Sequence, residues 1–173
     1  MHDATRPAPW TQFGHGGGKA ALYRDLAEEL DALLSGETDA TANTANAAAA
    51  IYHALPGLNW AGFYFLRDDT LVLGPFQGRP ACVRIKIGSG VCGTSVQQRR
   101  SILVPDVEQF PGHIACDTAS RSELVVPLLR DGKILGVLDL DSPDLARFDA
   151  EDQTGCEMLA AVVVRHLARS VLC

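Results

Sequence analysis

Three segments of the chain carry apolar residues at helical spacing: 19–34, about 42–55, and a last helix that begins after Asp149. Gly36 and Pro56-Gly57 end the first two segments, and Asp149 is a suitable N-cap for the third. The stripes expected to be buried are Leu22, Leu26, Leu30 and Leu33 in the first helix, Ile51 and Leu55 in the second, and Cys156, Leu159, Val163 and Leu167 in the third.

Between the second and last helices the pattern changes to the alternation that is typical of β-strands. We expect strands at 60–66, 71–76, 82–87, 101–104, 123–129 and 133–141, and a short helix-like stretch at 92–100. Asp131-Gly132 lies between two apolar runs and predicts a tight hairpin. The order of elements predicts an α+β fold, in which helices pack on one face of a central antiparallel sheet of about six strands.

The strand expected at 82–87 alternates apolar and polar residues. The apolar set Val83, Ile85 and Ile87 should face the core, which would place Cys82 on the other face beside Arg84 and Lys86. Cationic neighbours favour the thiolate form of a cysteine. The sequence therefore predicts a reactive environment for Cys82.

Length and charge narrow the class of protein. The 173 residues suit a glycine-rich N-terminal arm, 1–18, followed by one domain, 19–173. A net charge of −6 without a basic block argues against nucleic acid. No apolar run is long enough to cross a membrane, and the N-terminus lacks a secretion signal. Five cysteines, an odd number, argue against a secreted disulfide framework, so we expect a cytoplasmic protein.

The cysteines therefore need another explanation. Cys82, Cys92 and Cys116 all lie near turns or strand ends, and either three scattered core residues or a reactive set would fit this placement. No C-x₂-C spacing exists, and His113 with Cys116 is only a lone pair, so we expect no metal site. Cys156 is explained by core packing, and Cys173 has no local context.

Two aspartates stand two residues apart at the end of an apolar strand. Asp139 and Asp141 should share one face, where their repulsion would make at least one easier to protonate. Such a pair can donate a proton or bind an amine, although a strand end that reaches solvent would look the same. A strict two-residue hairpin pairs Glu123 with Leu140 and puts it on the opposite face. Glu123 joins the aspartates only if a bulge intervenes, which Pro127 makes credible.

Two aromatic residues share one face of the first expected strand. Trp60 and Tyr64 are explained by core packing or by contact with a small apolar ligand group.

Five segments together resemble the free methionine-(R)-sulfoxide reductases, which are single GAF-domain enzymes. The resemblance covers about residues 19–168 and is carried by 59–64, 73–78, 90–94, 112–117 and 136–142. It implies a GAF-like fold and a substrate that is the free amino acid. All the cysteine positions of the family are filled at the expected intervals.

The resemblance also assigns roles to residues. It implies that Cys116 is the nucleophile, Cys82 the main resolving cysteine and Cys92 an auxiliary thiol. The residues that it places around the substrate are Trp60, Tyr64, Glu123, Asp139 and Asp141. Attack on the sulfoxide would leave a sulfenic acid on Cys116, which would condense with Cys82 to a disulfide. Thioredoxin would reduce this disulfide, without cofactor or metal, and a homodimer is compatible with this interpretation.

Two other functions remain open at this point. A GAF sensor that binds a small ligand is disfavoured, because the chain ends soon after its last helix with no output module. A peroxide-type thiol switch would use the same two cysteines, Cys82 and Cys116. Consumption of free methionine sulfoxide, compared with consumption of peroxide, separates the switch from the reductase.

Overall fold

The computed structural model describes residues 17–114 and 118–167. The helices are α1 (Gly18–Leu34), α2 (Ala40–Ala54), α3 (Gly90–Gln98) and α4 (Ala150–His166), with a short 3₁₀ turn at Val107–Gln109. The strands are β1 (Trp60–Arg67), β2 (Thr70–Gly78), β3 (Arg84–Lys86), β4 (Ile102–Val104), β5 (Ser122–Arg130) and β6 (Lys133–Ser142). The predicted arm falls almost wholly outside the described residues, as do Cys116 and Cys173.

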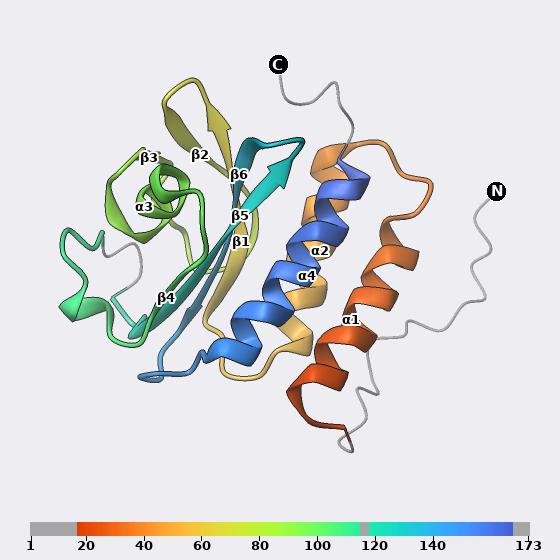
Figure 1. Ribbon diagram of the computed structural model, residues 1–173, viewed down its shortest axis with the longest axis horizontal. Helices are drawn as coiled ribbons and strands as arrows, with labels where there is room; N and C mark the ends of the chain where they lie inside the picture. The colour runs from red at the N-terminus through yellow and green to blue at the C-terminus, as the bar shows by residue number, and fades with distance from the viewer. Residues whose placement is uncertain (1–16, 115–117, 168–173) are drawn as a thin grey trace.

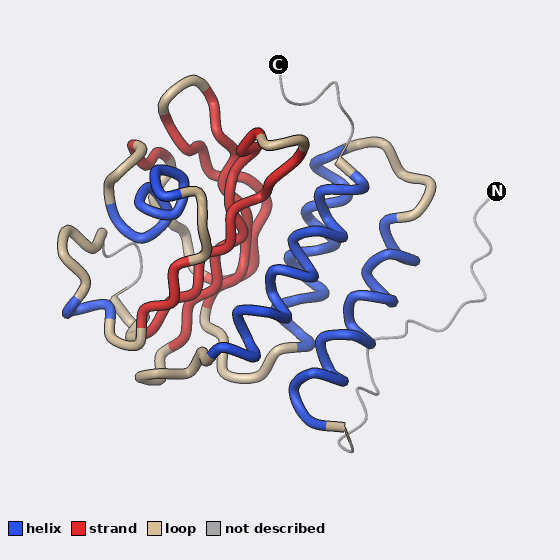
Figure 2. Tube along the Cα trace, in the orientation of Figure 1, coloured by secondary structure: helices blue, strands red, loops and turns tan. Residues whose placement is uncertain are grey.

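The six strands form one antiparallel sheet in the order β3-β2-β1-β6-β5-β4. Helices α2 and α4 pack on one face of the sheet, and α1 lies on their outer side, as Figures 1 and 2 show. The short helix α3 packs on the opposite face. The predicted α+β architecture is therefore confirmed for the three long helices, and α3 adds a second layer that proves important for the site.

Alternation along the central strands divides the core in two. Alternate residues of β1, such as Ala61 and Phe63, join the cluster beneath the long helices. Their neighbours Trp60 and Tyr64 join a second cluster beneath α3. Both aromatic side chains are buried, and they share one face as the sequence predicted.

The beginning of α4 is fixed by its own side chains and by α1. Asp149 caps the helix and forms a capping box with Asp152, which confirms the predicted N-cap. The Asp152 carboxylate is buried, and it accepts hydrogen bonds from Lys19 at 2.6 Å and from the Tyr23 hydroxyl at 2.8 Å. Arg147 adds an ion pair at 3.2 Å. This buried charge is thus neutralised and fully hydrogen-bonded.

The hairpin between β5 and β6 contains a β-bulge, the feature that was needed to bring Glu123 to the same face as the two aspartates. Arg130 pairs with Lys133 around Asp131-Gly132, as predicted, but the register then shifts between Leu128 and Leu129. Leu135 is the extra residue on β6, so Glu123 pairs with Asp141 and not with Leu140. Pro127 lies beside the bulge but keeps its regular partner.

The prediction for the segment 82–87 was wrong at its ends. Only residues 84–86 form β3, and only Ile85 of the apolar set is buried. Val83 is 64% exposed and Ile87 is 37% exposed. The cause is that the chain pairs with β2 over three residues only, so alternation does not extend to Cys82 or Ile87. Cys82 is half-buried and packs against the α3-side cluster.

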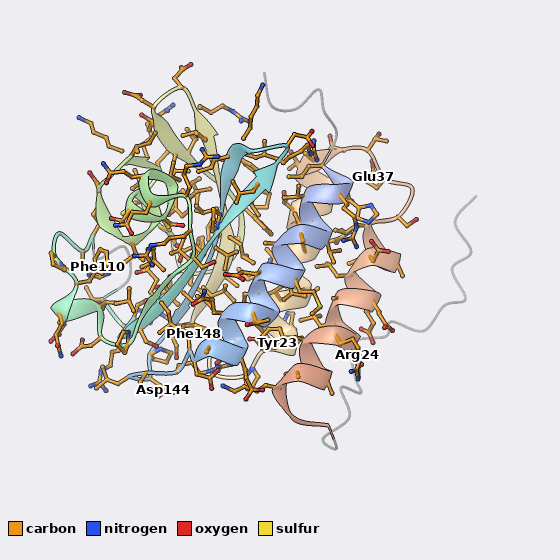
Figure 3. The ribbon with its side chains drawn as sticks, in the orientation of Figure 1. Tyr23, Arg24, Glu37, Phe110, Asp144 and Phe148 are labelled. Carbon is orange, nitrogen blue, oxygen red and sulfur yellow. The ribbon has the colours of Figure 1, made fainter. Side chains whose placement is uncertain are left out.

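The contact between α1 and α4 requires glycine at position 155, where a Cβ atom would lie 2.1 Å from the Tyr23 ring. Figure 3 labels Tyr23 on α1. Overpacking costs roughly 1–3 kcal/mol, and the better helix propensity of alanine returns about 1 kcal/mol. The difference is roughly 0–2 kcal/mol. Because 2.1 Å is a severe overlap, we expect Gly155→Ala to lower the free energy of unfolding by an amount in the upper half of that range, roughly 1–2 kcal/mol, measured by urea denaturation. Met158→Ala, on the exposed side of the same helix, is the control. A Gly155→Ala protein as stable as the parent would contradict this packing.

Candidate active site

A small cavity lies on the α3 side of the sheet, where the ends of β5 and β6 meet the first turn of α3. Its volume is about 30 Å³, and it is lined by Ile85, Gly90, Val91, Cys92, His113, Ile114, Ser120, Glu123, Asp139 and Asp141. A larger groove of about 620 Å³ lies between α4 and the β4–β5 edge. Its lining includes none of the candidate residues, so the small cavity is the candidate active site.

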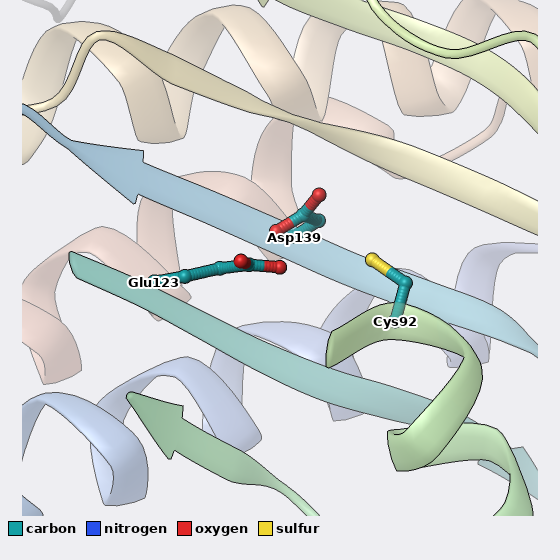
Figure 4. A group of neighbouring side chains, drawn as sticks. All are labelled: Cys92, Glu123 and Asp139. Atoms are coloured by element: carbon teal, nitrogen blue, oxygen red, sulfur yellow. The ribbon is translucent and has the colours of Figure 1, made fainter. Parts of the chain in front are cut away.

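Three polar side chains from separate elements converge at this cavity. Cys92 points from α3, Glu123 from β5 and Asp139 from β6, as Figure 4 shows. Their ligand atoms all lie within 4.8 Å of one another, and all three residues are buried. Asp139 shares hydrogen bonds with the Cys92 thiol and the Glu123 carboxyl group. Asp141, opposite Glu123, is half-buried beside them.

Burial and mutual repulsion favour the protonated forms of the carboxyl groups in this cluster. Burial raises the pKa of Asp139 to about 7. Burial and the neighbouring Asp139 and Asp141 raise the pKa of Glu123 well above its ordinary value. A hydrogen bond between two carboxyl groups needs a proton, so Glu123 donates it and Asp139 accepts it. The cluster thus holds protons near neutral pH. The sequence predicted that one of the two aspartates is easier to protonate, and Asp139 is, but the cause is burial and not repulsion from Asp141.

Cys92 lies in the first turn of α3, where the helix dipole favours a thiolate. The carboxylates oppose this effect: burial, followed by the charges of Asp139 and Glu123, raises the pKa of the Cys92 thiol well above its ordinary value. Cys92 is therefore held as a neutral thiol. This suits an auxiliary role better than that of the first nucleophile.

His113 adds an imidazole that the sequence had linked only to Cys116. Its Nε2 atom lies 3.7 Å from Glu123 Oε2, and burial lowers the pKa of His113. A neutral imidazole at this distance can accept a proton or bind a ligand. The spacing of His113 within the segment 112–117 was the one available signal, and it could not reveal a partner on β5.

The two aromatic residues stack beside the cluster and do not line the small cavity. Trp60 lies between Phe76, at a ring distance of 5.2 Å, and Tyr64, at 5.9 Å. The Trp60 indole donates a hydrogen bond to the carbonyl of Arg79, and the Tyr64 hydroxyl donates one to that of Cys82. Their polar ends therefore hold the segment that carries Cys82. A contact with substrate stays a prediction for both.

The cysteines divide as follows. Cys82 is disulfide-bonded, whereas Cys92 and Cys156 are free and buried. Cys156, a residue of α4, is fully buried in the core cluster of the long helices, which confirms its predicted place in the core. Cys116, the predicted nucleophile, lies outside the described residues, so its role and that of the neighbouring backbone amides stay predictions.

Comparison with known proteins tests the expected family membership of the chain. The GAF domain family matches residues 41–168. The free methionine-R-sulfoxide reductase of Escherichia coli is 51% identical over 150 residues, which span 87% of this chain and 91% of the relative. The chain belongs to this family of reductases. The Saccharomyces cerevisiae reductase is 42% identical and spans 84% of this chain and 85% of its own length.

The free methionine-R-sulfoxide reductase family also accounts for the fold. The X-ray structure of the Neisseria meningitidis enzyme in complex with its substrate superposes with a TM-score of 0.83. It is 45% identical and covers 87% of this chain and 90% of that one. The predicted GAF fold is therefore confirmed. No helix in the described ranges has the length and apolar character needed to span a membrane.

Asp139 binds a second proton below a pH of about 7, in addition to the proton on Glu123, and this second proton predicts how stability depends on pH. The folded state binds this proton more tightly than the unfolded chain, so the free energy of unfolding should fall as pH rises from about 4 to 7. Asparagine cannot ionise, so Asp139→Asn should raise the Tm at pH 8, and this gain should shrink toward pH 4. Each kcal/mol shifts the Tm by about 2–4 °C in a protein of this size.

Circular dichroism melts of the disulfide form at several pH values measure this effect. Asp131→Asn, in the exposed hairpin turn, removes the same charge from the surface and is the matched control. A lower Tm for Asp139→Asn than for the parent at pH 8 would refute the proposed burial penalty.

Proposed function

We propose that this protein reduces free methionine-(R)-sulfoxide to methionine through its cysteines. The observation that carries the proposal is the buried Glu123–Asp139 pair, which holds a proton beside a free thiol, Cys92. Sulfoxide reduction needs both a thiol that attacks sulfur and an acid that protonates the departing oxygen. The relatives named for this reaction support the choice of substrate.

The first step in the proposal uses Cys116. Its thiolate attacks the sulfoxide sulfur, the sulfur–oxygen bond breaks, and the oxygen passes to Cys116 as a sulfenic acid. Methionine leaves with its sulfur reduced by two electrons, and the cysteine sulfur is oxidised by two. The Glu123–Asp139 pair supplies the proton that the oxygen needs, because the raised pKa values of both carboxyl groups keep a proton in the pair at neutral pH.

The same carboxylates suit the charged end of the substrate. Asp139 Oδ1 is buried, and it accepts no hydrogen bond among the described residues. An ammonium group would satisfy this atom, and Asp141 lies near enough to share the charge. Because a methionine sulfoxide within a peptide lacks this ammonium group, such a pocket would select the free amino acid.

The second step in the proposal uses Cys82. Its thiol condenses with the sulfenic acid and releases water to form a disulfide, which thioredoxin reduces to two thiols in the cytoplasm. That Cys82 is disulfide-bonded supports this role. The hydrogen bond of 3.0 Å from Tyr64 to the carbonyl of Cys82 would keep the resolving cysteine beside the pocket.

Cysteine variants test the order of these steps. Cys116→Ser should abolish turnover, with a loss of at least about 1,000-fold, because Cys92, the free thiol in the pocket, is held neutral and is a poor nucleophile. Cys82→Ser should still form one equivalent of methionine, since only resolution is blocked. Both are measured with thioredoxin, thioredoxin reductase and NADPH on the free R and S sulfoxides. Cys156→Ala is the matched control, because Cys156 lies in the other core.

The result that would refute the assignment is multiple turnover by Cys116→Ser. Turnover of peroxide in place of methionine sulfoxide by the parent protein would instead favour the thiol switch.

The carboxylates are tested by amides of the same size. Glu123→Gln and Asp141→Asn should each lower kcat/KM by roughly 100-fold or more, the scale of general acid–base catalysis. Glu123→Gln should mainly lower kcat because it removes the proton donor, and Asp141→Asn should mainly raise KM. Asp131→Asn is the surface control. Near-normal rates in both active-site variants would place the general acid elsewhere.

A further inference from the structure

We propose that the cavity beneath α3 also binds a zinc ion, through Cys92, Glu123, Asp139 and His113. The sequence pattern gave no sign of such a site, because zinc motifs repeat cysteine or histidine at short spacing. Here the donors come from four separate segments of the chain: α3, the loop before residue 114, β5 and β6.

The distances between the donors suit a tetrahedral ion. Bonds to zinc of about 2.0–2.3 Å place neighbouring ligand atoms roughly 3–4 Å apart. The ligand atoms of Cys92, Glu123 and Asp139 lie within 4.8 Å of one another. His113 lies outside this group of three, with its Nε2 atom 3.7 Å from Glu123 Oε2. The three groups would move closer together by side-chain rotation on binding, and His113 would rotate toward the ion as the fourth ligand. Figure 4 shows the thiol and both carboxylates pointing toward one another.

The cavity itself has the size and the unsatisfied polarity of an ion site. The free space of about 30 Å³ is more than the roughly 10–15 Å³ that one water molecule needs, so an ion fits. Asp139 Oδ1 is buried without a hydrogen bond within the described part of the chain. Neither lysine nor arginine is among the described residues that line the cavity. Buried carboxylates without a cationic partner are the groups that a metal ion would stabilise.

The donor types select zinc over the harder cations. Magnesium and calcium prefer oxygen donors alone, whereas a thiolate with an imidazole and carboxylates favours zinc. On binding, the ion displaces the proton of Cys92 and the proton shared by Glu123 and Asp139, and these protons pass to the buffer. The oxidation states of the protein and the metal do not change.

The site has a functional consequence, and this part of the inference rests on the proposed function. The ion would occupy the position proposed for the substrate ammonium group and would hold Cys92. The two cannot bind together, because both would occupy Asp139 Oδ1. Zinc should therefore act as a competitive inhibitor and raise the apparent KM for free methionine-(R)-sulfoxide without changing kcat.

Binding is tested first, without substrate. We would use the full chain in its disulfide form and omit thiol reductants, so that Cys82 cannot serve as a ligand. Titration calorimetry with zinc alone should give one site per chain, and measurements in two buffers of different ionisation enthalpy should reveal released protons. Magnesium at the same concentration should not bind.

The variants then locate the ion. Cys92→Ser and Glu123→Gln should each weaken zinc binding by at least roughly 10–100-fold. Loss of a residue that only hydrogen-bonds to a metal ligand already has an effect of this size, so loss of a ligand should have at least the same effect. Cys156→Ala removes the other described free thiol and should bind as the parent does. Circular dichroism confirms that each variant is folded. Absence of a zinc site, or a site that both active-site variants retain, would overturn the proposal.

An activity measurement separates this proposal from the proposed function. If the metal-free protein reduces the R sulfoxide, and zinc binds but leaves KM unchanged, then zinc and the substrate ammonium group do not share a position. If zinc binds at Cys92 and the metal-free protein shows no reductase activity, the metal site stands and the proposed function fails.

Discussion

The extra residue in β6 decides what the pocket can do. A strand alternates its side chains between two faces, so a shift of one residue exchanges every side chain on it. Without Leu135 as a bulge, the hairpin at Asp131-Gly132 would pair Glu123 with Leu140 and turn its carboxyl group toward the long helices. The bulge instead gives Glu123 and Asp141 a common face. Every property of the cluster, from its shared proton to its proposed ligands, follows from this register.

That register brings together groups that repel one another. Opposed like charges destabilise a sheet, and burial without a cation adds to the penalty. The protein lowers this cost by keeping a proton on Glu123, which then donates to Asp139. A proton that relieves repulsion in the resting protein is also one that the pocket can release. The instability of the cluster and its chemical use therefore have the same origin.

The sequence predicted the fold well wherever structure depends on neighbours along the chain. The Asp149 cap and the hairpin turn are of this kind, and both are confirmed. The helical stripes are confirmed except in α1, where Leu22 and Leu33 are half-buried and the neighbouring Tyr23 and Leu34 are buried in their place. The prediction for Val83 was wrong because alternation holds only while a strand stays paired, and β3 pairs over three residues. The contact between His113 and Glu123 could not be predicted at all, because it joins a loop to a strand through the fold.

Two buried aspartates in this protein show how a structural charge differs from a functional one. Asp152, at the start of α4, is surrounded by Lys19, Arg147 and the Tyr23 hydroxyl, so its charge is neutralised within the protein and it fastens α1 to α4. Asp139 is buried to a similar extent, but its hydrogen bonds come from an acid and a thiol. Its other oxygen, Oδ1, has no hydrogen-bond partner among the described residues. Within the described residues nothing satisfies this oxygen, and a positively charged guest would. This is why both proposals, the substrate ammonium group and the zinc ion, place a positive charge at Asp139.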